Sequence, residues 1–365
     1  MKSDSSIAFV VDALPALGGG EKVLMAALNV FPHAEIFSLV YNKKAFVDTP
    51  LADRNIKTSF IDRIPLSHHN HRMFLPLMPL AIERFELQDF ETIVSFNYAV
   101  AHGIQNPGGA RHLSYTYTPM RYAWTNLNIN GITKHKSPLI ELFMKYFRLW
   151  DKRAASRVHQ FAAISQAVSR RIADAYQRQA VVIYPPVDVE RFNPPTERES
   201  FYITVTRLVP HKRVDILVDA FARLKFPLVI IGDGPELQRL KGQATPNIQF
   251  LGYQSDEKVA EYLGRARGFV CATEEDFGIA IVEAQAAGCP VIAYGSGGAL
   301  ETVIEGVTGV YFSEQTADCL TEAILKFESM QSFFCTSDLV RNAKRFNKEN
   351  FKQAFSNFVK ASKRN

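Results

Sequence analysis

Residues 274–303 read EEDFGIAIVEAQAAGCPVIAYGSGGALETV, and within them a loop enters a helix and a strand follows. The run 284–287 is good helix material, and Gly288 is a typical helix-ending residue because glycine adopts the left-handed conformation without strain. The short apolar run 291–294 then predicts a buried strand. A helix followed closely by a strand is the repeating unit of an α/β protein.

The same alternation extends through the chain in both directions. Helical stretches such as 137–157 and 213–224 separate short apolar runs that are typical of buried strands. Alternation of this kind implies parallel sheets covered by helices. The strands that we expect are 7–11, 35–41, 90–95, 112–117, 159–163, 201–206, 227–231, 248–251, 268–272 and 291–294.

The length of the chain implies two domains, because single hydrophobic cores stop growing at roughly 250–300 residues and this chain has 365. Proline density rises at 184–188 and 192–195, where neither a helix nor a central strand can continue. We therefore predict an N-terminal Rossmann-like domain over 1–185, a Pro-rich linker over 186–199, a C-terminal Rossmann-like domain over 200–345, and a C-terminal helix over 346–365 that could pack back on the N-terminal domain. Two doubly wound domains joined in this way should leave a cleft at the carboxyl ends of their strands.

Composition excludes several classes of protein. With 47% hydrophobic and 22% charged residues the chain is typical of a soluble globular protein, and its apolar runs are far shorter than the roughly 20 residues needed to cross a bilayer. The N-terminus lacks the pattern of a secretory signal, so we expect a cytoplasmic protein. Its net charge of +5 is a mild excess that usually indicates only a solvated surface, and it is compatible with an anionic ligand or with peripheral contact at the inner face of a membrane.

Two carboxylates and a glycine stand out within the opening stretch. Glu275 and Glu283 flank the Phe277-Gly278 turn. If Gly278 lies at the start of a helix, the unpaired amides there offer an anion site, and Glu283 can reach a sugar hydroxyl. Taken alone, a pair of acids like this one favours solvated residues beside an amphipathic helix.

A resemblance decides between these interpretations. Residues 274–303 resemble the donor-site signature of family-four retaining glycosyltransferases of the GT-B fold, whose two Rossmann-like domains face each other across a cleft. Further similar segments are Val205–Lys212, which is similar to G-R-L-x-x-x-K, residues 231–235, the G-G-x-E turn at 18–21, and the T-P-M-R-Y block at 118–122 of polysaccharide-assembly members. The resemblance covers nearly the whole chain.

The resemblance implies a role for each matching residue. Arg207 and Lys212 would bind the donor diphosphate, Glu275 would hydrogen-bond the transferred sugar, and Glu283 would hold the ribose hydroxyls. Positive groups and helix-terminal amides can stabilise a departing nucleoside diphosphate without a metal. We expect no metal and no cofactor besides the donor, since no Asp-x-Asp pair is present. The remaining donor-site positions are Gly18, Gly19, Gly20, Gly234, Phe277, Gly278, Ile279 and Ala280.

Two positions depart from the family pattern. Tyr98 and Tyr117 stand where relatives carry histidine. Tyr117, the fourth candidate catalytic residue beside Glu275, Arg207 and Lys212, can donate a hydrogen bond but cannot be cationic at neutral pH. Activation of the acceptor or choice of the donor could therefore differ from the relatives.

The resulting expectation is a retaining, metal-independent hexosyltransferase. It would move a sugar from a donor of the UDP-glucose or GDP-mannose type to a hydroxyl of a growing, lipid-linked polysaccharide. A sugar-nucleotide hydrolase or epimerase and a non-catalytic subunit of polysaccharide assembly remain alternatives, whereas the missing G-x-G-x-x-G disfavours a nicotinamide dehydrogenase. The runs 71–80 and 145–153 mix basic and apolar residues, for which ordinary amphipathic packing is favoured over membrane docking, and no module indicates nucleic acid.

Overall fold

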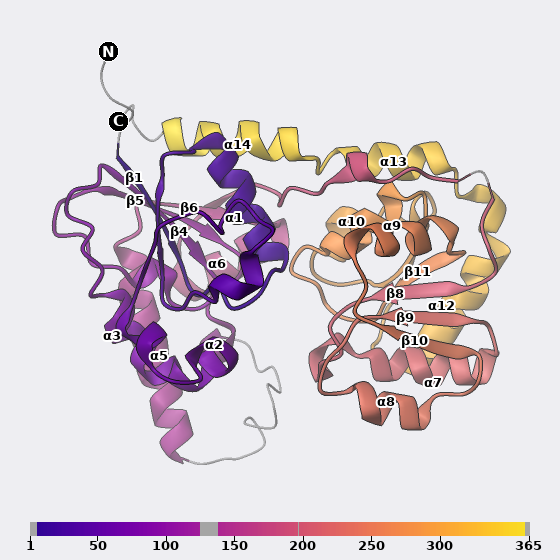
Figure 1. Ribbon diagram of the computed structural model, residues 1–365. Helices are drawn as coiled ribbons and strands as arrows, with labels where there is room; N and C mark the ends of the chain where they lie inside the picture. The colour runs from indigo at the N-terminus through magenta and orange to yellow at the C-terminus, as the bar shows by residue number, and fades with distance from the viewer. Residues whose placement is uncertain (1–5, 125–137, 196, 362–365) are drawn as a thin grey trace. The chain divides into compact units, whose positions relative to one another are not determined.

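The computed structural model describes residues 6–124, 138–195 and 197–361, which form two compact units (Figure 1). Of the described residues, unit 1 contains 6–124, 138–186 and 351–361, and unit 2 contains 187–195 and 197–350. Each unit is a parallel sheet with helices packed on it. Within the described ranges, no helix combines the length and the apolar content needed to cross a membrane.

Unit 1 contains a seven-stranded sheet in the order β3-β2-β1-β4-β5-β6-β7. Every pairing between neighbouring strands is parallel. The strand order reverses at β1 and β4, so the loops that follow these two strands lie beside each other at the carboxyl edge, where such sheets bind ligands. The strands are β1 Ile7–Val11, β2 Glu35–Ser38, β3 Ile56–Thr58, β4 Thr92–Asn97, β5 Arg111–Thr116, β6 Gln160–Ala163 and β7 Ala180–Val182.

The helices of unit 1 include a segment from the C-terminal end of the described chain. Residues 351–361 of α14 belong to this unit, and the Phe355 ring lies 6.2 Å from Phe9 and 5.9 Å from Phe96, which project from β1 and β4. All three phenylalanines are buried, so α14 completes the core of the sheet. The helices are α1 Gly19–Val30, α2 Ser67–Asn70, α3 Met78–Ile82, α4 Arg121–Trp124, α5 Pro138–Ser156, α6 Gln166–Tyr176 and α14 Lys348–Ala361, with a 3₁₀ helix η3 at His71–Leu77.

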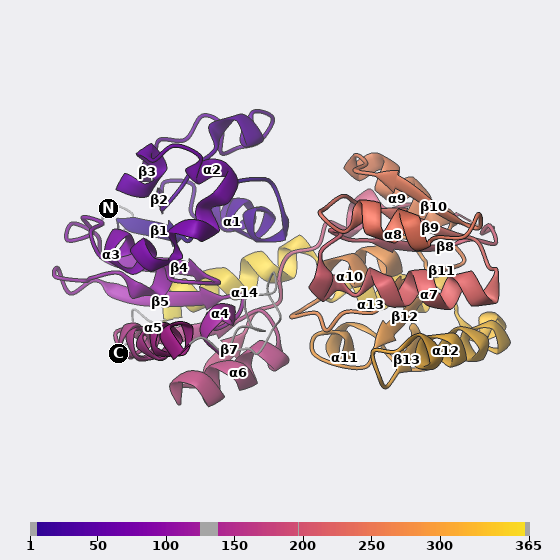
Figure 2. The same cartoon turned by 90° about the horizontal axis from the view of Figure 1, so that it is seen from below.

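Unit 2 repeats this topology with six strands in the order β10-β9-β8-β11-β12-β13 (Figure 2). The order reverses at β8 and β11, which pair in parallel. Its strands are β8 Tyr202–Val205, β9 Leu228–Ile231, β10 Ile248–Gly252, β11 Gly268–Cys271, β12 Val291–Tyr294 and β13 Gly309–Phe312, and its helices are α7 Val214–Leu224, α8 Leu237–Gln243, α9 Asp256–Arg265, α10 Ile279–Ala286, α11 Ala299–Thr302, α12 Ala317–Ser329 and α13 Thr336–Lys344.

The predicted fold class is confirmed, because both halves are α/β with doubly wound parallel sheets. The strands that sequence patterns did not predict are β3, β7 and β13. The first two are three residues long, too short for a clear apolar pattern. The Pro-rich segment packs on unit 2: the amide of Val187 donates to the carbonyl of Phe346 at 2.8 Å, and Asp188 pairs with Lys348.

Candidate functional site

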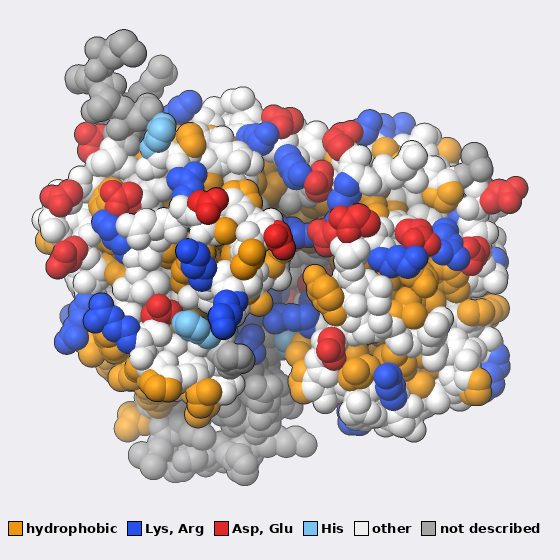
Figure 3. Space-filling model, viewed as in Figure 1, with side chains coloured by type: hydrophobic (Ala, Val, Ile, Leu, Met, Phe, Trp, Pro, Cys, Tyr) orange, Lys and Arg blue, Asp and Glu red, His pale blue; other side chains and the backbone are white. Residues whose placement is uncertain are grey.

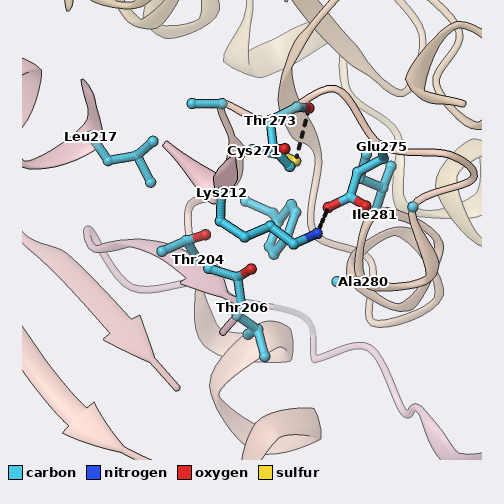
Figure 4. A pocket seen from close by; sticks show the side chains of 13 residues that line it. Thr204, Thr206, Lys212, Leu217, Cys271, Thr273, Glu275, Ala280 and Ile281 are labelled. Carbon is cyan, nitrogen blue, oxygen red and sulfur yellow. Dashed lines mark hydrogen bonds and ion pairs between the residues drawn. The ribbon is translucent and has the colours of Figure 1, made fainter. Parts of the chain in front are cut away.

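A pocket lies at the carboxyl edge of the unit 2 sheet, where the strand order reverses. The chain leaving β8 enters the short 3₁₀ helix η7 at Pro210–Lys212, and the chain leaving β11 forms the loop 272–278 before α10. Because β8 and β11 are neighbours, these two segments meet. The pocket is lined by Thr204, Val205, Thr206, Lys212, Leu217, Phe269, Cys271, Ala272, Thr273, Glu275, Gly278, Ala280 and Ile281 (Figure 4).

Two predicted residues form an ion pair in this pocket. Lys212 Nζ lies 2.6 Å from Glu275 Oε1, and the side chains are 18% and 22% exposed. Figure 4 shows them pointing toward each other from the two loops. The Thr273 hydroxyl donates to the carbonyl of His211 at 2.8 Å, which ties the β11 loop to the turn that carries Lys212. Acid and base are thus held together where a ligand can reach both.

The start of α10 supplies the third side of the pocket. Gly278 precedes the helix with φ of 93°, a conformation in which a larger residue would be strained. The first amides of a helix have no partner within it and carry partial positive charge. Gly278 and Ala280 line the pocket, so an anion bound there would meet Lys212 as well as the helix start.

Two glycines missed by sequence reasoning hold the Glu275 loop in place. The amide of Gly298 donates to the carbonyl of Glu275 at 2.7 Å. A Cβ at Gly298 would lie 2.4 Å from the Cα of Phe277, and a Cβ at Gly297 would lie 2.3 Å from the Glu275 carbonyl oxygen. Only glycine permits this approach of the two backbones. Both glycines belong to the G-S-G-G turn after β12, and this cluster of glycines was the sequence feature that could have identified them.

Cys271 also lines the pocket but is not activated for chemistry. Burial raises the pKa of its thiol to about 12, and the negative charge of Glu275 acts in the same direction. The thiolate is the nucleophilic form of cysteine, and a pKa this high leaves almost none of it at neutral pH. Cys271 therefore offers no nucleophile at neutral pH, and the charged side chains that line the pocket are Lys212 and Glu275.

Glu283 makes a different ion pair and does not line this pocket. Its Oε1 lies 2.8 Å from Nη2 of Arg191, and the two side chains are 13% and 19% exposed. Arg191 also contacts Asp256 at 2.9 Å and stacks on Phe192, with its guanidinium carbon 4.5 Å from the ring centroid. Sequence reasoning did not single out Arg191, which lies in the segment predicted to be a linker.

The other predicted positions in unit 2 take varied places. Arg207 is exposed and lies outside the pocket lining. Gly234 supports the turn after β8, since a Cβ there would lie 2.3 Å from the carbonyl oxygen of Leu208. Phe277 is buried and its ring packs edge-on against Phe346 at 5.2 Å. Ile279 is half-buried at the start of α10.

In unit 1 the glycine turn and Tyr117 come together. Gly18 precedes α1, and Gly19 and Gly20 form its first residues. The Tyr117 hydroxyl donates to the carbonyl of Gly20 at 2.9 Å. Burial, with smaller contributions from neighbouring groups, holds the pKa of Tyr117 well above its usual value of 10.0. The phenol is thus neutral and its proton is engaged within the protein.

An acidic residue that sequence reasoning missed organises the loop that carries Tyr98. Asp12 follows β1 directly, and its carboxylate accepts hydrogen bonds of 2.6 to 3.0 Å from the amides of residues 98–101. Burial raises the pKa of Asp12, while the four amides oppose that rise. Its position directly after a buried strand was the sequence feature that could have identified Asp12.

Comparison with models of protein families gives a match that covers unit 2. Residues 188–350 match the family model described as glycosyl transferases group 1. The second unit is a group 1 glycosyl transferase domain. The matched residues include Lys212 and Glu275 of the pocket. They also include Arg191 and Glu283. The glycine turn and Tyr117 of unit 1 lie outside that match.

Curated relatives of this glycosyl transferase domain are similar over part of the chain. One is the uncharacterized glycosyltransferase MJ1178 of Methanocaldococcus jannaschii, 30% identical over 207 residues, which are 55% of this chain and 58% of the relative. Another is the GDP-mannose-dependent alpha-(1-6)-phosphatidylinositol monomannoside mannosyltransferase of Mycobacterium tuberculosis, 32% identical over 193 residues, or 44% and 50% of the two chains. The chain spans about half the length of the curated relatives it matches.

Solved structures resemble the chain along its length. Anabaena Alr3699/HepE in complex with UDP-glucose matches with a TM-score of 0.73 and 19% identity over 97% of this chain and 99% of that one. Sucrose-phosphate synthase from Thermosynechococcus elongatus matches with a TM-score of 0.75 and 17% identity over 98% and 99%. At these identities the likeness shows the fold, and the predicted GT-B fold with two Rossmann-like domains is confirmed.

Proposed function

We propose that this chain transfers a hexose from a nucleoside-diphosphate sugar to a hydroxyl of a growing, lipid-linked polysaccharide at the cytoplasmic face of a membrane. The name of the mycobacterial relative specifies GDP-mannose as the donor and a phosphatidylinositol mannoside as the acceptor. A structural neighbour was solved with UDP-glucose. These two proteins support a sugar-nucleotide donor of the UDP-glucose or GDP-mannose type, and the first supports a lipid acceptor.

The Lys212–Glu275 pair beside the start of α10 is the observation that carries this proposal. A sugar nucleotide joins a diphosphate, which needs positive partners, to a sugar whose hydroxyls need acceptors. Lys212 and the α10 amides suit the diphosphate. The Glu275 carboxylate suits a sugar hydroxyl. One pocket therefore offers complementary groups to both halves of the donor.

In the proposed reaction the bond between the anomeric carbon and the diphosphate oxygen breaks, and its electron pair leaves with the diphosphate. The acceptor oxygen bonds to the anomeric carbon on the same face, and its proton passes to the departing diphosphate oxygen, so the configuration is retained. Lys212 and the amides of α10 stabilise the charge that develops on the leaving group. We include Arg207 and the glycine turn at 18–20 as further diphosphate contacts, and Glu283 as the ribose contact.

Thermal unfolding in the presence of individual sugar nucleotides tests the donor assignment. A ligand at one hundred times its dissociation constant stabilises the folded protein by roughly 2.7 kcal/mol, so the true donor should raise Tm the most. Absence of stabilisation by every UDP- and GDP-sugar would remove the basis of the proposal. The same ligands with Glu275→Gln show whether binding depends on this pocket.

Product analysis tests the reaction itself. With the best donor and a lipid-linked glycan acceptor, the anomeric configuration of the product should equal that of the donor, and a chelator should leave the rate unchanged. Release of free sugar without transfer would identify a hydrolase, and an altered sugar nucleotide would identify an epimerase. Binding without turnover for any acceptor would identify a non-catalytic subunit.

A further inference from the structure

Helix α5, Pro138–Ser156, has an inner face that is fully used by the core of unit 1. Phe147 is buried, and the Trp150 indole donates to Glu83 at 2.9 Å. Asp151 is also buried and accepts from the Trp124 indole at 2.6 Å and from the Tyr176 hydroxyl at 2.7 Å. These contacts fix the rotation of the helix about its axis, which determines the residues that face outward.

The outer face of α5 carries a stripe of large apolar side chains. Leu142 is 66% exposed, Tyr146 is 58% exposed and Leu149 is 70% exposed. Their spacing of four and three residues places them in a row on one side of the helix. Single exposed apolar residues are ordinary on a protein surface, but a continuous row of them marks an interaction site.

Basic side chains lie next to this stripe. Lys145, Arg148, Lys152 and Arg153 are exposed on the same helix, whereas Glu141 is the exposed acid among its residues 141–156. Arg148 is held in place by donating to the Ala123 carbonyl at 2.5 Å. An apolar row bordered by cations is the pattern with which a helix lies in the plane of an anionic lipid surface.

A second segment adds to the same surface. Met73 is 76% exposed, Leu77 is 40% exposed and Leu80 is 47% exposed, in η3 and α3. The inward residues of this segment, such as Met78, belong to the hydrophobic cluster that also contains Phe147 of α5. Figure 3 shows apolar side chains gathered with Lys and Arg side chains over the part of unit 1 where Figure 1 draws α3 and α5.

We propose that the outer face of α5, together with Met73, Leu77 and Leu80, docks unit 1 on an anionic membrane surface. The inference deepens the proposed function, since a lipid-linked acceptor is presented at such a surface. The positive charge of this face favours an anionic membrane over a second copy of the chain as its partner. In a two-fold dimer through this face, the four cations of α5 would lie opposite the same four cations of the other copy and repel them. The sequence pattern alone favoured ordinary packing, which accounts only for the inner face.

Co-sedimentation of the full chain with vesicles, without donor or acceptor, tests the proposal. The protein should bind vesicles of equal parts phosphatidylcholine and phosphatidylglycerol, bind phosphatidylcholine alone far more weakly, and dissociate as salt is raised. The double variant Leu142→Ser and Leu149→Ser should bind these vesicles at least about tenfold more weakly than the wild type, because it removes apolar groups that enter the membrane. Lys145→Gln with Arg153→Gln should weaken binding and reduce its salt dependence.

Leu325→Ser with Phe333→Ser is the matched control, since these residues of unit 2 are 52% and 68% exposed and lie outside the proposed surface. This variant should bind like the wild type, and circular dichroism should show that every variant is folded. Equal binding by all variants would overturn the proposal. So would a dimer formed without vesicles and lost on changing Leu142 and Leu149. Because no sugar nucleotide is present, these results are independent of the proposed transferase activity.

Discussion

Lys212 Nζ and Glu275 Oε1 lie 2.6 Å apart, although 63 positions separate these residues in the sequence. The parallel pairing of β8 with β11 brings the two loops together. The ion pair brings opposite charges into contact. A sugar nucleotide would provide Lys212 with phosphate oxygens and Glu275 with a sugar hydroxyl, so the two residues should depend on each other in function.

Substitution at either residue of this pair should strongly reduce transfer. We expect Lys212→Met and Glu275→Gln each to lower kcat about 10²–10³-fold, the range found when one group that stabilises transition-state charge is removed. The fold decrease in kcat of the double variant should be smaller than the product of the two single decreases, because the residues act together. Initial rates with saturating donor measure this. A full rate in Glu275→Gln would contradict the proposed site, and Lys225→Met, on an exposed turn of the same unit, is the control.

Arg191 should act by positioning Glu283. Because Arg191 bridges Glu283 and Asp256, Arg191→Met should remove an ion pair that helps to orient the Glu283 carboxylate and raise the donor KM about tenfold, with a smaller change in kcat. A donor that lacks the ribose hydroxyls should bind wild type and variant almost equally. Arg191→Lys should recover part of the loss. A fall in kcat with an unchanged KM would refute a role in holding the ribose.

Gly298→Ala should disturb the Glu275 loop. The added Cβ would lie 2.4 Å from the Cα of Phe277, so the backbone must shift at a cost of about 1–3 kcal/mol. For a domain of this size that corresponds to a fall in Tm of about 2–4 °C for each kcal/mol, together with weaker donor binding. Gly242→Ala is the control, since it lies in α8 with open space around its Cβ. It should leave Tm unchanged or raise it slightly.

Tyr117→Phe tests the pH behaviour of unit 1. The folded state holds the Tyr117 proton more tightly than the unfolded state, because burial raises its pKa well above 10.0. This contribution to stability is complete below about pH 10 and is lost as the pH rises further. Tm should therefore fall less steeply above pH 10 in Tyr117→Phe than in the wild type.

The same variant separates a structural role from a catalytic one. Below pH 9 it should lose about 1 kcal/mol of stability with the hydrogen bond to Gly20. The pH profile of transfer between 6 and 9 should keep its shape, since a neutral phenol does not titrate in this range. A changed profile would show that Tyr117 takes part in proton transfer.

Sequence alone determined the repeated architecture of this protein. Apolar runs of strand length, separated by helical stretches, indicate parallel α/β sheets because strands buried on both faces of such a sheet are apolar along their whole length. The stretch 274–303 also located the loop before α10, since a glycine at a helix start and an acid beside it are local features. Segments with weak local patterns, such as β3 at Ile56–Thr58, became strands only by pairing with a neighbour.

Tertiary structure decided the partner of each functional side chain. Glu275 pairs with Lys212, Glu283 with Arg191, and Tyr117 with the carbonyl of Gly20. It also decided that α5 turns Leu142 and Leu149 outward. These relationships join residues distant in the sequence or depend on the rotation of a helix against its core. Strand order and core packing set them, and neither is encoded in the local pattern around a single residue.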